Sequence, residues 1–169
     1  MVEELRDQVY WWSQKLVKKG YRSEGIVLLL STWNFAYMRY VMRKFNLEKF
    51  ENILDKCNFE YFSKKKFEKL DFTDEEIRKK IKELYYSLSS FKGIRYVGAT
   101  KIMHIINPKV FLMWDSKIIR KNKVDVSPEG YLDFMIKMQK KYKTGKFGKL
   151  RIKDNTIPRA IDIYNLNHA

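Results

Sequence analysis

Residues 91–115 read FKGIRYVGATKIMHIINPKVFLMWD, and this stretch decides the fold predicted for the chain. Gly93 and Gly98 supply the backbone freedom that a compact turn between two helices needs. The second helix is expected over residues 99–106, because Pro108 disfavours helical backbone at the residue before it. The free N–H groups at the start of that helix would form a phosphate site. The stretch therefore predicts a helical hairpin that can hold an anion.

A single carboxylate follows the hairpin. Residues 110–114 form an apolar run, extended or turn-like, that ends at Asp115. Asp115 is the only acidic residue between Lys92 and Lys123, a stretch that holds eight Lys or Arg. A helix is expected to begin directly after it, where an ionised carboxylate is favoured. Asp is also a preferred N-cap residue, so capping alone would explain its position.

Helical periodicity extends over the rest of the chain. Apolar residues recur at three- and four-residue spacing over residues 3–19, and a long helix is predicted over residues 24–44 with Ser23 as its N-cap. Thr73–Glu76 (TDEE) has the pattern of a capping box. Further helices are expected over residues 47–57, 59–70, 77–91, 128–143 and 157–165. The prediction is one all-α domain over residues 1–169, which could form two helical lobes with a cleft between them.

The positive charge is unevenly distributed. Residues 1–91 hold 18 basic and 14 acidic side chains, whereas residues 92–169 hold 17 basic and 6 acidic ones, for a net charge of +15. A strong positive field on one half of a small domain is typical of a nucleic-acid-binding protein. A lysine-rich, heat-adapted protein is the alternative, but there acidic residues rise together with lysine. The balance therefore favours DNA, or RNA, as the partner.

Other classes of protein find little support in the sequence. One cysteine, Cys57, rules out an intramolecular disulfide and a zinc site of several thiolates, and no cofactor or metal motif occurs. The most apolar region, residues 26–42, is interrupted by Asn34 and Arg39, so it predicts a buried helix and no membrane span. We expect a monomeric, cytoplasmic, nucleoid-associated protein without a signal peptide.

Residues 77–122 resemble the helix-hairpin-helix DNA glycosylase superfamily. In that family a hydrophobic-Pro-Gly-Val-Gly hairpin binds a DNA phosphate, and a downstream Asp does the chemistry. Residues 94–98 (IRYVG) stand at the hairpin, and residues 114–117 (WDSK) stand where the family has its Val-Asp-Thr-His type of motif. The resemblance implies a helix-hairpin-helix motif at about 77–107 and a catalytic-type Asp segment at 110–122.

The chain departs from the family pattern around the hairpin. Tyr96 replaces the first hairpin glycine, and the segment between the hairpin and Asp115 is somewhat short. Bifunctional members carry their nucleophilic Lys two positions after the last hairpin Gly, where this chain has Thr100, and Lys101 follows one place later. That offset turns a helical side chain by roughly 100°. Thr100 suits a monofunctional enzyme that uses water; Lys101 is either a Schiff-base nucleophile or a phosphate-contacting or surface lysine.

The resemblance also implies roles for individual residues. Asp115 would stabilise the positive charge that builds on the sugar and would activate water. The expected contacts to the DNA backbone are Gly93, Arg95, Gly98, Ala99, Thr100, Lys117, Arg120 and Lys121. The glycines of this set could equally form an ordinary turn, and each basic side chain alone could be a solvated charge.

A flipped base needs an aromatic face for stacking and a polar group that reads its edge. Trp33 and Tyr37 are an i, i+4 pair beside Asn34, and Trp114 precedes Asp115. His104 could shuttle protons near such a pocket. Each has a structural alternative, since the aromatic residues could be core and His104 a satisfied buried residue.

The predicted function is excision of a damaged or mispaired base from DNA by hydrolysis of its N-glycosidic bond. One alternative is a non-catalytic DNA- or RNA-binding protein with the same fold. Another is a protein-interaction domain whose basic face meets an acidic partner.

Overall fold

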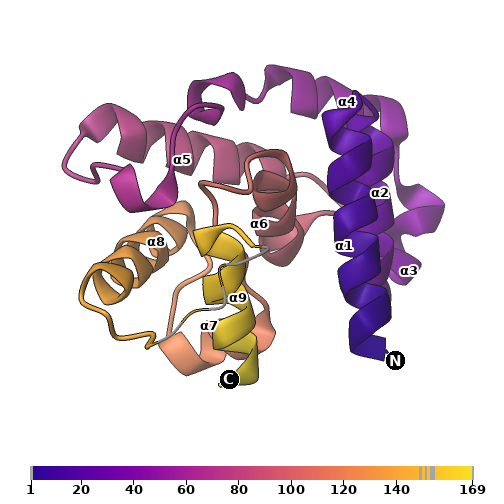
Figure 1. Cartoon of the computed structure of the whole chain (residues 1–169). Helices are drawn as coiled ribbons and strands as arrows, with labels where there is room; N and C mark the ends of the chain where they lie inside the picture. The colour runs from indigo at the N-terminus through magenta and orange to yellow at the C-terminus, as the bar shows by residue number, and fades with distance from the viewer. Residues whose placement is uncertain (1, 149, 151, 153–154, 169) are drawn as a thin grey trace.

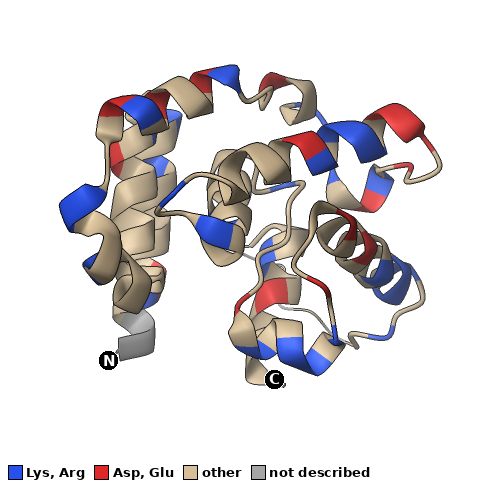
Figure 2. Cartoon of the chain, turned by 180° about the vertical axis from the view of Figure 1, so that it is seen from behind, with Lys and Arg blue, Asp and Glu red and all other residues tan. Residues whose placement is uncertain are grey.

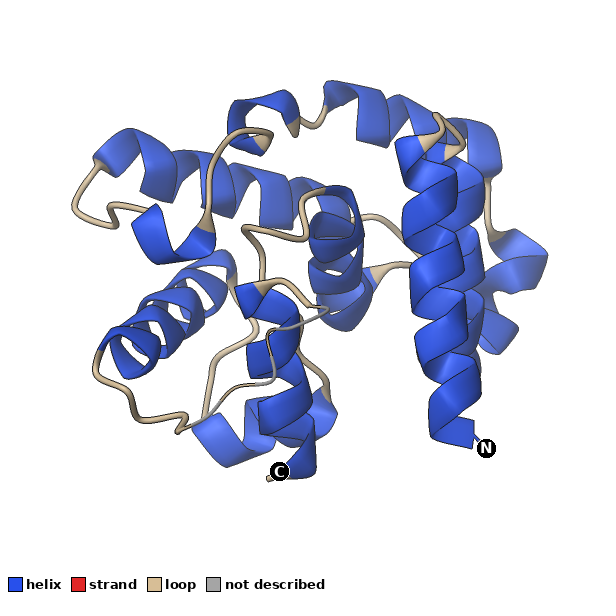
Figure 3. Ribbon diagram, in the orientation of Figure 1, coloured by secondary structure: helices blue, strands red, loops and turns tan. Residues whose placement is uncertain are grey.

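The computed structural model describes residues 2–148, 150, 152 and 155–168, and these residues contain no β-strand (Figure 1; Figure 3). The described chain forms nine α-helices and three short 3-10 turns. They are α1 (Val2–Lys18), α2 (Arg22–Trp33), α3 (Phe35–Val41), η1 (Met42–Lys44), α4 (Leu47–Lys56), η2 (Glu60–Phe62), η3 (Phe67–Lys69), α5 (Glu75–Ser89), α6 (Arg95–Ile106), α7 (Ser116–Asn122), α8 (Pro128–Lys143) and α9 (Ile157–Asn167). The predicted all-α class is confirmed. None of the helices in these ranges is long and apolar enough to cross a membrane.

α1 and α2 lie side by side as an antiparallel pair at one end of the molecule (Figure 1). Gly25 permits their close approach, because a Cβ there would lie 2.7 Å from the carbonyl oxygen of Ser13. α6 lies at the centre, where it contacts α1, α2 and α5, and α8 packs against α5. α7 and α9 contact each other and lie below and to the left of α6 in the view of Figure 1. α6 is thus the element that joins the N-terminal pair to the rest.

The helix predicted over residues 24–44 is wrong in both its start and its continuity. Ser23 lies inside α2 and is not its N-cap. The helix then breaks at Asn34, whose φ of −133° lies outside the helical region. At the break, the ammonium of Lys101 donates a hydrogen bond to the carbonyl of Trp33. A side chain from α6 thereby takes a carbonyl that a continuous helix would use itself.

The helix predicted over residues 59–70 is also wrong, because two separate 3-10 turns, η2 and η3, occupy it. Contacts from distant segments take its backbone groups. The N–H of Phe67 donates to the carbonyl of Lys109 at 2.8 Å. The side-chain amide of Gln139 donates to the carbonyls of Phe67 and Leu70. These tertiary hydrogen bonds outweigh the local helical pattern.

The start of α5 corrects the predicted capping box. The N-cap is Asp74, whose carboxylate accepts from the N–H groups of Glu76 and Ile77. The hydroxyl of Thr73 instead donates to the carboxylate of Asp71 at 2.7 Å. Thr73 therefore belongs to the turn before the helix.

The turn between α5 and α6 is shorter than predicted. Gly93 (φ +114°) and Arg95 (φ +57°) complete it, so α6 begins at Arg95. Gly98, Ala99 and Thr100 consequently lie inside α6 and are buried. Their N–H groups belong to the helix interior, so the phosphate site predicted there is wrong. The exposed first turn of α6 lies closer to Arg95.

Candidate functional site

A cavity of about 180 Å³ lies between the α1–α2 pair and the α7–α9 end of the molecule. It is bounded by side chains from α1, α2, α6, α7, α9 and the extended segment before α7. Its lining is Arg6, Asp7, Trp33, Lys101, Met113, Trp114, Asp115, Ile118, Arg159, Asp162, Ile163, Leu166 and Asn167.

A second cavity, of about 290 Å³, adjoins the first. It is lined by Trp33, Asn34, Tyr37, Ile94, Arg95, Tyr96, Val97, Lys101, Asp115 and Ser116. Trp33, Lys101 and Asp115 line both cavities and so stand where the two meet. The structure therefore brings together three side chains that lie up to 82 residues apart (115 − 33) and that the sequence predicted separately.

Asp115 is held at the start of α7. Its Oδ1 accepts hydrogen bonds from the N–H groups of Lys117 at 2.9 Å and Ile118 at 2.8 Å. The predicted N-cap is confirmed. Both hydrogen bonds use Oδ1, so the second carboxylate oxygen, Oδ2, takes no part in capping the helix. The side chain is half-buried at the meeting point of the cavities.

Lys101 is 5% exposed on α6 and lines both cavities. Burial lowers its pKa to about 8; the positive charge of Arg6 acts in the same direction, and Asp115 opposes it. Its ammonium donates to the carbonyl of Trp33. The register offset noted in the sequence has not turned Lys101 away from Asp115. Its position suits either a contribution to chemistry or a cap on the end of α2.

Trp33 is fixed by contacts on several sides. Its indole N–H donates to the carbonyl of Arg6 at 3.0 Å, and its ring stacks on Tyr10 with centroids 5.6 Å apart. The guanidinium of Arg159 lies 4.7 Å from the Trp33 ring centroid and 4.8 Å from that of Tyr10. A half-buried aromatic face of this kind is pre-organised at the cavity.

Trp114 anchors the segment that carries Asp115. It is 1% exposed, its indole N–H donates to the carbonyl of Tyr96 at 3.1 Å, and its ring packs edge-on against Tyr131. Its backbone N–H donates to the hydroxyl oxygen of Thr100 at 3.3 Å. Of the two roles considered for Trp114, the structure favours the core anchor, although the residue also lines the cavity.

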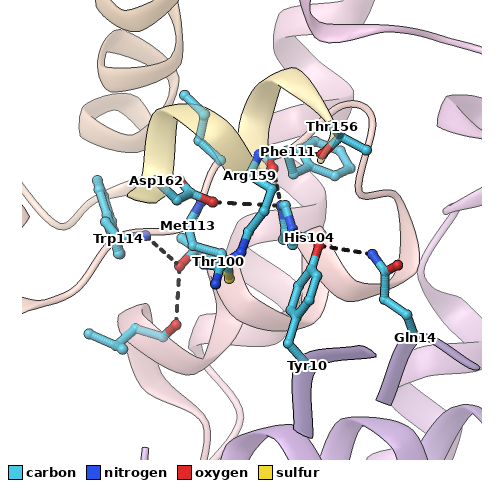
Figure 4. Close-up of polar contacts among 12 residues, drawn as sticks. Tyr10, Gln14, Thr100, His104, Phe111, Met113, Trp114, Thr156, Arg159 and Asp162 are labelled. Carbon is cyan, nitrogen blue, oxygen red and sulfur yellow. Dashed lines mark hydrogen bonds and ion pairs between the residues drawn. The ribbon is translucent and has the colours of Figure 1, made fainter. Parts of the chain in front are cut away.

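His104 lies in the core, and the prediction of a base-pocket role for it is wrong. Its Nδ1 lies 2.6 Å from the carbonyl of Phe111 and must carry the proton, so Nε2 accepts from the hydroxyl of Tyr10 at 2.7 Å (Figure 4). Gln14 donates in turn to Tyr10. Burial lowers the pKa of His104 to about 3. His104 is not among the described residues that line either cavity.

Arg159 and Asp162, one turn apart on α9, are site residues that sequence reasoning missed. Both are buried and both line the first cavity. Arg159 donates to Asp7 at 2.8 Å, and Oδ1 of Asp162 accepts from the N–H of Met113 at 3.0 Å. Within the described ranges, Nη1 of Arg159 and Oδ2 of Asp162 have no hydrogen-bond partner. The available signal was weak: a charged pair on the otherwise apolar face of the last helix.

The remaining predicted contacts fall into two groups. Lys117, Arg120 and Lys121 are exposed along α7, and Figure 2 colours the ribbon blue at basic residues such as these. Burial lowers the pKa of Lys141, and the positive charges of Lys137, Lys121 and Lys146 lower it further, so the basic surface continues from α7 onto α8. Gly93, by contrast, is buried against the turn, where a Cβ would lie 3.1 Å from the ring of Phe45. Residues 137–153 hold eight Lys or Arg and no acidic residue, and part of this run lies outside the described residues.

The chain was compared with models of protein families, with curated proteins and with solved structures, and no match was found in any of the three. Over the described ranges, no three His, Cys, Asp or Glu side chains are placed to hold a metal ion.

Proposed function

We propose that this chain is a helix-hairpin-helix DNA N-glycosylase-like protein that holds an extruded base in the paired cavities and hydrolyses its bond to deoxyribose. The observation that supports it most directly is the meeting of Asp115, Lys101 and Trp33 where the two cavities join. An aromatic face, a carboxylate and a cation around one cavity are the groups that such a reaction uses.

Asp115 carries the chemistry in this proposal. Breaking an N-glycosidic bond builds positive charge on the sugar, and an ionised carboxylate stabilises that charge. The two backbone N–H groups on Oδ1 hold the side chain in place at the start of α7. Oδ2 is then available to orient or deprotonate the attacking water.

Lys101 contributes a positive charge and holds the end of α2, while water is the nucleophile. With a pKa of about 8, most of the amine is protonated at pH 7, and its proton is engaged by the carbonyl of Trp33. A Schiff-base nucleophile must be uncharged when it attacks. The site thus fits a monofunctional enzyme better than a bifunctional one.

DNA would lie across the basic face of α7 and α8. Lys117, Arg120 and Lys121 lie on α7, which Asp115 caps, so phosphate contacts there would bring a target nucleotide to the cavities. Arg95 lines the second cavity at the start of α6 and adds a further cation. We also propose that the protein is a monomer and associates with the nucleoid.

The test is single-turnover base release from labelled duplexes that each carry one uracil, hypoxanthine, 8-oxoguanine, 7-methylguanine or mismatched base. Wild type and Asp115→Asn are compared on each duplex, and binding to the same duplexes is measured in parallel. We expect release by the wild type, its loss in Asp115→Asn, and unchanged binding. Release that survives in Asp115→Asn would remove Asp115 from the mechanism.

A non-catalytic nucleic-acid-binding protein is the second candidate. The hydrogen bonds of Asp115 to the start of α7, and of Lys101 to Trp33, are sufficient to explain why both residues are present. This candidate predicts salt-sensitive binding to DNA or RNA with no base released from any duplex. Absence of binding at low salt would exclude both candidates and leave a protein partner.

A further inference from the structure

Two carboxylates line the first cavity, and their environments are opposite. Asp115 is half-buried and accepts two backbone N–H bonds through Oδ1. Asp162 is 1% exposed, and its Oδ1 accepts one backbone N–H, that of Met113. Its Oδ2 is buried and finds no partner in the part of the chain that the structure describes. A pair of carboxyl groups whose surroundings differ in this way is suited to divide acid and base roles.

Charged and titratable groups face Asp162 from several helices. Arg159 lies on its own helix, His104 comes from α6 with Nδ1 3.9 Å from Oδ2, and Tyr10, Tyr131 and Asp115 come from α1, α8 and the segment before α7. His104 does not pair with Asp162 as a cation, because burial lowers its pKa to about 3 and its Nδ1 proton is given to the carbonyl of Phe111. Burial raises the pKa of Asp162 well above its usual value, and Asp115 adds to this, while Arg159 and the Met113 N–H oppose it.

We propose that Asp162 is the acid of this site: Oδ2, which is covered in this structure, is uncovered when a base enters the cavity and donates its proton to the base as it leaves. This inference rests on the proposed function. The C1′–N bond breaks, and its electron pair goes to the base, which takes the proton of Asp162. Water adds to C1′ and gives a proton to the carboxylate of Asp115. Asp162 then regains a proton and Asp115 loses one to solvent, which restores the starting state.

Arg159 supports the same step. Its Nη2 donates to Asp7, and the guanidinium carbon lies 4.8 Å from the ring centroid of Tyr10 and 4.7 Å from that of Trp33. Its Nη1 has no partner among the described residues and carries positive charge beside the cavity. Negative charge on an exocyclic oxygen of the leaving base would be stabilised there.

An acid at this site favours one class of substrate. Neutral bases such as uracil, hypoxanthine and 8-oxoguanine leave as anions unless they are protonated, so they benefit from an acid. A 7-methylated guanine already carries a positive ring and leaves as a neutral molecule, so it needs no proton. We therefore assign the site to neutral lesion bases with an oxo group.

The test compares wild type, Asp162→Asn and a control, Asp133→Asn, which removes an exposed carboxylate on α8. Single-turnover release is measured from duplexes with uracil, hypoxanthine, 8-oxoguanine or 7-methylguanine. In Asp162→Asn, release of the neutral base should fall by about 10²-fold or more, the usual contribution of a general acid, while 7-methylguanine release changes little. The control should match the wild type.

Other outcomes separate the two proposals. An equal loss on neutral and methylated bases in Asp162→Asn would show a structural role, overturning this inference and leaving the proposed function intact. Release of 7-methylguanine, but of no neutral base, by the wild type would also overturn this inference and leave the proposed function intact. No release of any base by the wild type would overturn both proposals.

A second measurement uses the wild type alone, so it does not depend on whether a variant folds. In the wild type, release of a neutral base should decline at high pH as Asp162 loses its proton, while release of 7-methylguanine shows no matching decline. Parallel pH profiles for the two substrates would exclude Asp162 as the donor.

Discussion

The ammonium of Lys101, on the central helix α6, donates a hydrogen bond to the carbonyl of Trp33, the last residue of α2. This hydrogen bond joins the break between α2 and α3 to the site, because both residues line both cavities. A cation is favourable at the C-terminal end of a helix, where carbonyl groups lack partners. The same hydrogen bond keeps the amine buried beside Asp115, so structure and candidate chemistry depend on one side chain.

Replacing Lys101 by Met should change how stability depends on pH. The folded pKa of about 8 lies below the value of 10.5 for the free side chain, so the folded protein releases this proton first. Wild type should therefore gain stability relative to Lys101→Met as pH rises from about 8 to 10.5, by roughly 3 kcal/mol. Urea unfolding of both proteins over this range measures it, and tyrosine ionisation cancels in the difference. A constant difference would contradict the lowered pKa.

Lys101 should not form a covalent adduct with DNA. Wild type is incubated with a labelled duplex that carries an abasic site, borohydride is added, and adducts are separated by denaturing electrophoresis. We expect none at pH 7, because the amine is mostly protonated and is bound to Trp33. Lys101→Met is the control for adducts at other lysines. An adduct seen in wild type and missing in Lys101→Met would establish a bifunctional enzyme.

The parts of the fold that follow local patterns could be predicted from the sequence. α1, α4, α5 and α8 lie close to the predicted ranges, and their apolar periodicity is a local signal. The break at Asn34 could not, because the hydrogen bond that holds the end of α2 comes from Lys101, 67 positions further along the chain (101 − 34). The 3-10 turns near Phe67 depend similarly on the distant side chain of Gln139.

The sequence likewise predicts only part of the candidate site. Motif and spacing predict Asp115, Lys101 and Trp33 separately as site residues, and the structure places all three at one junction. Their chemical roles remain a prediction. Asp162 and Arg159 could not be found, because α9 lies outside the motif and its fold-back onto the cavity is a tertiary event. Periodicity indicates a buried face but not which cavity it meets.

His104 should make the protein sensitive to mild acid. Its folded pKa of about 3 lies below the value of 6.5 for the free side chain, so the unfolded state binds a proton first as pH falls. This contribution to stability is complete above pH 6.5 and is reduced by about 2 kcal/mol at pH 5. Urea unfolding of wild type and His104→Gln at pH 7 and pH 5 isolates it. Equal losses in both proteins would show that His104 does not titrate this way.

Two substitutions at Asp115 should separate its cap from its chemistry. Asn can still accept the N–H bonds of Lys117 and Ile118, so Asp115→Asn should unfold at nearly the wild-type denaturant concentration. Asp115→Ala removes the cap and should cost about 1 kcal/mol. Both variants should lose base release, because neither carries a carboxylate. Urea unfolding and single-turnover release are measured on the same preparations, and a fully active Asp115→Asn would leave only the capping role.

The basic surface of α7 should make DNA binding steeply dependent on salt. Each Lys or Arg that binds a phosphate displaces about one counterion, so removing one such side chain should lower the slope of log affinity against log salt by about one.

The test variant replaces three exposed residues of α7 by Gln: Lys117, Arg120 and Lys121. A control with the same reduction in charge replaces three exposed lysines elsewhere: Lys49, Lys64 and Lys66. Binding to a labelled duplex is followed by fluorescence anisotropy across a range of salt concentrations. We expect the α7 variant to bind more weakly and with a shallower slope, while the control keeps the wild-type slope. Equal effects of the two variants would mean that net charge, and not this surface, attracts the DNA.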